Sequence, residues 1–124
     1  MGWEPYNLDQ IAHDLVYERK DHQDLLGQVY KMRTTVAYGL ERFWGEKLRL
    51  HGEEAKYWEA TWDKLVDVME RAGIEIPNHA DPGQQITQLW LDSKEKRDDR
   101  KVALAVLTQL CDCMIWWRQR YKKA

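Results

Sequence analysis

The chain has 124 residues, of which 44% are hydrophobic and 32% charged, and its formal net charge is −2. This length and composition predict one globular domain over residues 1–124, with a core large enough to need neither disulfides nor metal. They exclude a disordered chain, and they restrict any contact with nucleic acid to a local basic patch.

Two helical patterns occupy the first 50 residues. Residues 8–16 carry apolar side chains at helical spacing, and the polar stretch 17–24 follows. A second series at steps of three and four predicts a helix from about 23 to 50, with these residues inward: Leu25, Leu26, Val29, Met32, Val36, Leu40, Phe43, Trp44 and Leu48. The two series share a phase, so one helix over 8–50 is the alternative, but we favour a break near 20–23.

The middle of the chain predicts a long helix, a loop and a short helix. The long helix runs from Glu53 to Ala72, and Gly73 supplies its left-handed end. Residues 74–83 form a loop that contains Asp-Pro-Gly. The short helix covers about 84–91 with Ile86, Leu89 and Trp90 inward, and the charged segment 93–99 opens the last helix.

The last helix is apolar from Val102 to Trp117, apart from Thr108, Gln109 and Asp112. It rises roughly 24 Å, short of a hydrocarbon core of roughly 30 Å, so no membrane span is predicted. Apolar side chains on nearly every side indicate that neighbours surround it. Asp112 either shares a narrow solvent-facing polar strip with Thr108 and Gln109, or is buried and paired with an Arg or Lys from another helix or subunit.

These elements predict an all-α fold, a four- to five-helix bundle with antiparallel neighbours in which the C-terminal helix is the most enclosed. Cys111 and Cys113 lie about 200° apart around a helix axis, so they cannot pair with each other. They are expected to be reduced, and the N-terminal sequence has no apolar signal region. A cytoplasmic location is therefore expected.

No motif predicts a metal site or a cofactor. A di-iron bundle needs Glu-x-x-His pairs on facing helices, and the sequence contains none. The four histidines, His13, His22, His51 and His79, are expected on the surface or in turns.

A magnesium-dependent all-α nucleotide pyrophosphohydrolase is the main enzymatic alternative. Such an enzyme holds the ion with carboxylates at i and i+3 on facing helices. Glu18, Asp21 and Asp24 have this spacing, as do Asp67 and Glu70. Both sets are expected to point to water, which favours solvated charge, and the chain is expected not to be an enzyme.

Seven Trp and six Tyr accompany a single Phe, which favours a protein that works by contact. We expect an interaction or assembly protein that self-associates, as a homo-oligomer, or acts as a small subunit of a larger complex. The expected contact uses some of the tryptophans and a basic rim: Trp3, Trp44, Trp90, Trp116 and Trp117, with Arg118, Arg120 and Lys122 at the edge.

Contact with a nucleic-acid backbone is the second alternative. Lys31, Tyr38, Arg42 and Arg49 would lie along one outer side of a helix over 23–50. Cations beside aromatic rings hold single strands without reading their sequence. The basic C-terminal tail adds further candidates: Arg118, Arg120, Tyr121, Lys122 and Lys123. A small all-helical chain with a broad apolar helix and basic edges is similar to the small helical subunits of RNA-guided defence complexes, and equally to many unrelated bundles.

Overall fold

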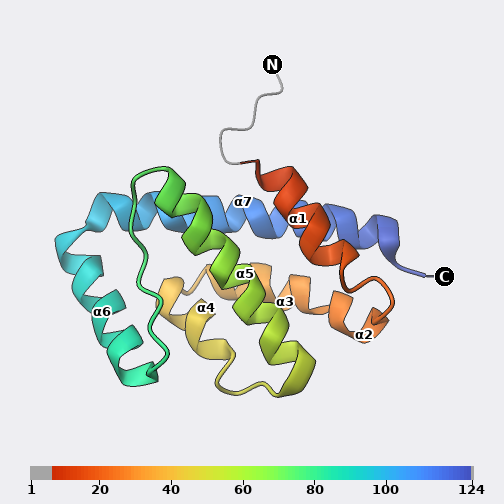
Figure 1. Cartoon of the computed structure of the whole chain (residues 1–124), viewed down its shortest axis with the longest axis horizontal. Coiled ribbons are helices and arrows are strands. Elements are labelled where there is room, and N and C mark those ends of the chain that lie inside the picture. Colours follow the sequence, from red (N-terminus) through yellow and green to blue (C-terminus); the bar gives the residue numbers. More distant parts are fainter. Residues whose placement is uncertain (1–6, 124) are drawn as a thin grey trace.

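The computed structural model describes residues 7–123, and all regular structure in this part of the chain is helical (Figure 1). It contains seven helical segments rather than four or five: α1 (Leu8–Tyr17), α2 (Gln23–Leu26), α3 (Gln28–Val36), α4 (Leu40–Glu46), α5 (Gly52–Arg71), α6 (Pro82–Glu95) and α7 (Arg97–Tyr121). The predicted all-α class is confirmed. Trp3 lies outside the described residues.

The segment from 18 to 51 differs most from its prediction. A turn over 18–22 confirms the expected break. The single helix over 23–50 is wrong, because the chain turns between α3 and α4. Gly39 adopts φ +100°, which residues with a Cβ rarely adopt, and a Cβ there would lie 3.0 Å from the Glu41 Oε2 atom. Leu48, expected inside, follows the end of α4 and is exposed.

The second half of the chain follows its prediction more closely. Helix α5 matches the expected range to within a residue at each end, and Gly73 has φ +81°. Helix α6 begins at Pro82, where the side chain of Asp81 accepts a hydrogen bond from the Gln84 backbone N–H. It ends at Glu95, four residues beyond the predicted end. Trp90 is 59% exposed, so its predicted inward position is wrong.

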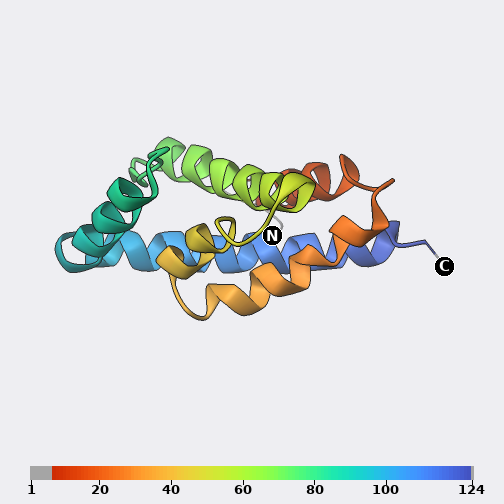
Figure 2. The ribbon, with the colours of Figure 1, turned by 90° about the horizontal axis from the view of Figure 1, so that it is seen from below.

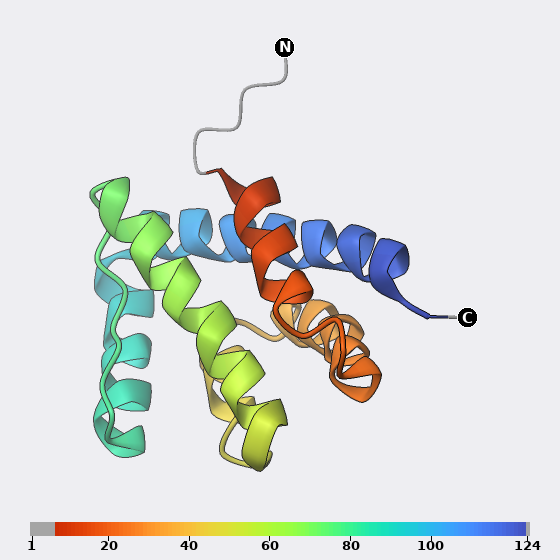
Figure 3. The ribbon, with the colours of Figure 1, turned by 45° about the vertical axis from the view of Figure 1, so that its right-hand side comes forward.

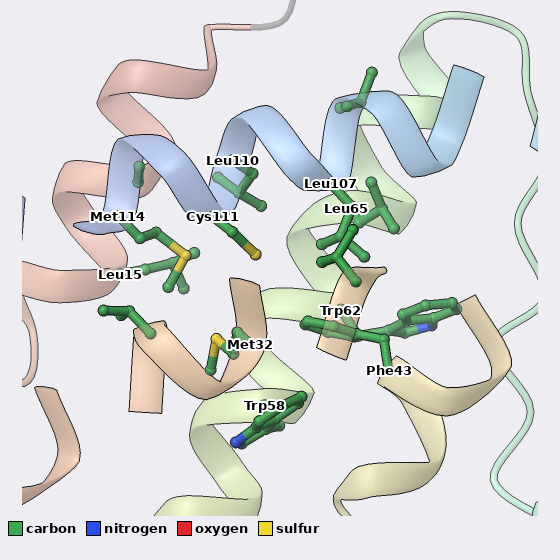
Figure 4. Close-up of a cluster of buried hydrophobic side chains, with 14 of the residues drawn as sticks. Leu15, Met32, Phe43, Trp58, Trp62, Leu65, Leu107, Leu110, Cys111 and Met114 are labelled. Atoms are coloured by element: carbon green, nitrogen blue, oxygen red, sulfur yellow. The ribbon is translucent and has the colours of Figure 1, made fainter. Parts of the chain in front are cut away.

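The core lies where α7 meets α1, α3 and α5 (Figure 2). Helices α1 and α5 cross α7 obliquely rather than lying along it (Figures 1 and 3). Leu107 of α7 lies beside Leu65 and near Trp62, whereas Met114 lies beside Leu15 (Figure 4). The Phe43 ring lies 4.9 Å from the ring of Trp58. Trp44, Trp58 and Trp62 are all buried, so three of the seven tryptophans belong to the core.

The prediction that neighbours surround α7 on every side is wrong within this chain. Helix α7 packs against four other helices, α1, α3, α5 and α6. Its buried residues nevertheless occupy one side only: Ala103, Val106, Leu107, Leu110, Cys111 and Met114. The opposite side is exposed along the whole helix. The solvent side of α7 therefore carries short apolar residues, Val102 and Ala105, beside polar ones such as Gln109.

An ion pair fixes the corner between α6 and α7. The guanidinium of Arg100, near the start of α7, binds the carboxylate of Glu41 on α4. It also donates a hydrogen bond of 2.6 Å to the Leu89 carbonyl of α6. Both charged side chains are less than a fifth exposed. Burial lowers the pKa of Arg100. Three helices are thus joined at one point.

Helix α7 is the longest helix of the chain. Over residues 7–123, neither it nor any other helix combines the length and the apolar character that crossing a membrane requires.

Candidate functional site

The outer face of α7 is an extended exposed surface with few charges. We define it by five exposed residues at steps of three and four: Val102, Ala105, Gln109, Asp112 and Trp116. These steps place the five side chains on one line along a helix. They span 14 residues, or roughly 21 Å. Val102 is 39% exposed and Trp116 47% exposed.

Asp112 is the only charged member of this face. Its Oδ1 atom accepts a hydrogen bond of 2.7 Å from the Nε atom of Arg33 on α3. Both expectations for Asp112 are therefore met in part: it is exposed beside Gln109, and it is paired with an arginine of another helix. Because Arg33 balances the carboxylate, the face as a whole carries little net charge.

An aromatic cluster joins α1 to the end of α7. We define it by His13 and Tyr17 of α1 with Trp117 and Tyr121 of α7. The His13 ring lies 4.6 Å from the Trp117 ring, and its Nε2 atom is 2.6 Å from the Tyr121 hydroxyl. The Tyr17 and Tyr121 rings are 5.5 Å apart. Edge and stacked contacts of this kind stabilise packing beyond the apolar area they bury.

This cluster was not predicted, because His13 was expected on the surface or in a turn. His13 is half-buried, and its Nδ1 atom lies 3.0 Å from the Asp14 carboxylate. A signal was present in the sequence: His13 and Tyr17, like Trp117 and Tyr121, are four residues apart and share a helix face. Nothing in the sequence alone showed that the two pairs meet.

Trp116 and Trp117 differ in their surroundings. The Trp117 indole N–H donates a hydrogen bond of 3.0 Å to Asp9 of α1, which fixes this half-buried ring. Trp116 is more exposed, and the Arg120 guanidinium lies 3.6 Å from its ring centroid. Trp116 and Arg120 together form an exposed cation–π pair at the C-terminal end of the outer face.

The C-terminal tail is held against the turn before α2. The Gln23 side chain donates to the Tyr121 carbonyl at 3.4 Å and accepts from the Lys123 backbone N–H at 2.9 Å. The Lys123 ammonium lies 3.6 Å from the Asp21 carboxylate. Lys123 and Tyr121 thus have partners within the chain, and both were predicted to contact nucleic acid.

Three other basic residues of the tail are not neutralised by a carboxylate among residues 7–123. No carboxylate of residues 7–123 forms an ion pair with Arg118, Arg120 or Lys122. The Arg118 guanidinium lies 5.3 Å from the ring centroid of Tyr30 on α3, beside the exposed Lys31. The end of α7 therefore presents cations beside aromatic rings.

The structure brings together only part of the predicted contact surface. Trp116, Trp117, Arg118, Arg120 and Lys122 follow one another at the end of α7. Trp90 lies on α6, at the opposite end of the molecule from the C-terminus (Figure 1). Trp44 is buried, so the expectation that it contacts a partner is wrong.

The predicted basic line over residues 31–49 does not exist as proposed, because it assumed an unbroken helix. Lys31 lies on α3 and Arg42 on α4, while Tyr38 and Arg49 lie in the turns that follow these helices. Arg49 binds Glu46. All four residues are exposed, but helical periodicity no longer aligns them.

The two carboxylate sets of the hydrolase alternative line different surface clefts. Asp21 and Asp24 line a cleft of about 640 Å³ at the start of α5. Asp67 and Glu70 line another of about 480 Å³ beside Lys64. Glu18 pairs with its neighbour Arg19. Within the described residues, no group of three histidine, cysteine or acidic side chains is arranged to hold a metal ion.

Cys111 lies on the packed side of α7, and Cys113 lies about 200° around the same helix from it. Burial raises the pKa of the Cys111 thiol from 9.0 to about 12, and the nearby Arg33 only partly offsets this rise. Cys111 is fully buried, whereas Cys113 is partly exposed. A thiol with a raised pKa is a poor nucleophile, because the thiolate is the reactive form.

Comparison with known proteins adds no further information on this surface. The chain matches no protein-family model, no curated protein and no solved structure.

Proposed function

We propose that this chain is a non-enzymatic assembly protein that docks through the outer face of α7. The observation that carries the proposal is the exposure of Val102, Ala105 and Trp116 on one line of the longest helix. A helix face of this kind usually packs against another surface, because the free energy falls when exposed apolar side chains leave water. Fully burying a side chain such as that of Val102 contributes about 1.5–3 kcal/mol, and Ala105, with a single methyl group, contributes less.

Rigidity and charge support the same role. Helix α7 packs against four other helices, so its outer face is held in one shape before any partner arrives. A preformed surface loses little conformational entropy on binding. The Asp112 charge is balanced by Arg33, which lowers the cost of removing water from the centre of the face. Trp116 offers the kind of side chain that dominates binding energy at protein interfaces.

Light scattering over a range of protein concentrations, together with a pull-down, tests the proposal. Ala105→Arg places a long charged side chain in the middle of the outer face and should abolish assembly. Thr87→Arg is the matched control, because Thr87 is also exposed within a helix, on α6. A wild-type protein that stays monomeric and captures no protein contradicts the proposal, as does equal binding by the two variants.

A second candidate function is contact with a nucleic-acid backbone at the C-terminal end of α7. The specific observation is that Arg118, Arg120 and Lys122 have no ion-pair partner within residues 7–123, while Tyr30 and Trp116 lie beside two of them. Phosphates attract such cations and bases stack on such rings. This surface differs from the predicted line over 31–49, of which it retains only Lys31.

Binding of a labelled single-stranded RNA tests this second candidate. Replacing Arg118, Arg120 and Lys122 by Ala should reduce the slope of log K against log salt by about 2. Replacing Lys94, Arg97 and Lys101 by Ala is the matched control, because these exposed cations lie at the end of α6 and the start of α7, away from the tail. Equal losses from both triple variants, or no RNA binding at low salt, contradict specific contact at the tail.

A further inference from the structure

We infer that the partner of the outer face is a second copy of this chain, bound with its α7 antiparallel and centred on Gln109. This inference rests on the proposed function and adds the identity and direction of the partner. Gln109 is the third of the five positions that define the face, so it lies at the centre of the line from Val102 to Trp116. A two-fold axis through Gln109 would place it opposite its own copy.

Two charged residues extend the line at its ends. Asp98, four residues before Val102, and Arg120, four residues after Trp116, continue the steps of the outer face. Both side chains are exposed, and neither forms an ion pair within residues 7–123. Asp98 lies 11 residues before Gln109, and Arg120 lies 11 residues after it. The two opposite charges are therefore equidistant from the centre.

The relative orientation of the two α7 helices follows from this placement of charge. In an antiparallel pair centred on Gln109, Asp98 of each copy lies opposite Arg120 of the other, so both ends of the contact hold opposite charges. In a parallel pair in register, Asp98 would lie opposite Asp98 and Arg120 opposite Arg120. Charges that flank a helix–helix contact determine which orientation forms, because juxtaposed like charges destabilise it. Charge complementarity selects the antiparallel pair.

The residues between the two ends also match in this direction. Val102 and Trp116 are each seven residues from Gln109, so the two largest of the three exposed apolar side chains of the face meet across the axis. Ala105 lies opposite the Asp112 side of the partner, where its small size leaves room for the Arg33–Asp112 pair. The two Gln109 amides can donate to and accept from each other. Such a contact is isologous and closes as a dimer.

Charge-reversal variants of the full chain test the inference, with dimerisation measured by sedimentation velocity. Arg120→Asp or Asp98→Arg alone should weaken the dimer by about tenfold, since an exposed pair is worth a few-fold and the two-fold axis doubles its effect. The double variant Asp98→Arg with Arg120→Asp should restore the dimer to within about threefold of wild type. Circular dichroism of each variant establishes that it is folded.

Asp99→Arg and Lys101→Asp are the matched controls, because these exposed residues of α7 lie off the outer face. They should leave the dimer unchanged. A dimer that the double variant fails to restore, or that the single reversals leave intact, overturns the antiparallel contact but leaves docking through α7 standing. A monomeric wild type also overturns the inference. In that case the pull-down tests the proposed function separately: the wild type should capture a partner protein that Ala105→Arg does not capture.

Discussion

The ion pair between Arg100 and Glu41 should be among the strongest polar contributions to stability. Arg100→Ala removes the charge-assisted contact with Glu41 and the hydrogen bond of 2.6 Å to the Leu89 carbonyl. It also leaves the Glu41 carboxylate, 17% exposed, without its cation. A hydrogen bond to a charged group contributes about 1.5–3 kcal/mol, and breaking a buried pair costs about 3–5 kcal/mol. Partial exposure places the expected loss near the lower end, at about 3 kcal/mol.

Urea unfolding followed by circular dichroism measures this loss as a decrease in the free energy of unfolding. Arg49→Ala is the matched control, because Arg49 binds Glu46 but is 63% exposed, and its removal should cost less than about 1 kcal/mol. A double-mutant cycle with Glu41→Gln should give a coupling free energy of about 1–2 kcal/mol between the two side chains. Equal losses from Arg100→Ala and Arg49→Ala would refute the argument that burial at the corner of α6 and α7 makes this pair strong.

Three further predictions concern the turn after α3, the buried thiol and the exposed tryptophan. Gly39→Ala should lower the free energy of unfolding by about 2 kcal/mol, because φ +100° disfavours a Cβ. Gly45→Ala, with no atom within 4 Å of the added Cβ, should raise it by about 0.5–1 kcal/mol; the same sign for both would contradict this. Burial raises the pKa of Cys111 from 9.0 to about 12, so its contribution to stability is complete below pH 9 and declines as the pH rises toward 12. Cys111→Ala should therefore lose less stability between pH 9 and 11 in urea titrations, and an identical decline would refute this. Trp116→Ala should weaken assembly while changing the free energy of unfolding by less than about 1 kcal/mol, and a large loss of stability would show that its ring belongs to the core.

Local sequence signals predicted α5 well because nothing interrupts its periodicity and Gly73 ends it. They failed over residues 23–50, where the apolar steps continue across Gly39 although the backbone turns there. Periodicity reports which residues are apolar on one side. It does not report whether a glycine will adopt a positive φ, which depends on contacts such as the one between Glu41 and Arg100.

The candidate site, like the fold, could be predicted from the sequence only in part. The run from Trp116 to Lys122 was proposed as a contact surface from its residue types alone, and the structure exposes Trp116, Arg120 and Lys122. The polar strip predicted the exposed side of α7 at Gln109 and Asp112. That this side extends to Val102 and Ala105 was not recognisable, because these two are as apolar as the buried residues beside them. The aromatic cluster was also missed, since His13 and Tyr121 are 108 residues apart and only the packing of α1 on α7 joins them.

Disulfide cross-linking at Gln109 tests the central claim most directly. In a chain with Cys111 and Cys113 replaced by Ala, Gln109→Cys places one thiol at the centre of the outer face. Mild oxidation should convert most of the protein to a covalent dimer, while Thr87→Cys in the same background, on the exposed side of α6, should stay monomeric. Slow, equal cross-linking of the two variants would contradict docking of one copy on another through the outer face of α7.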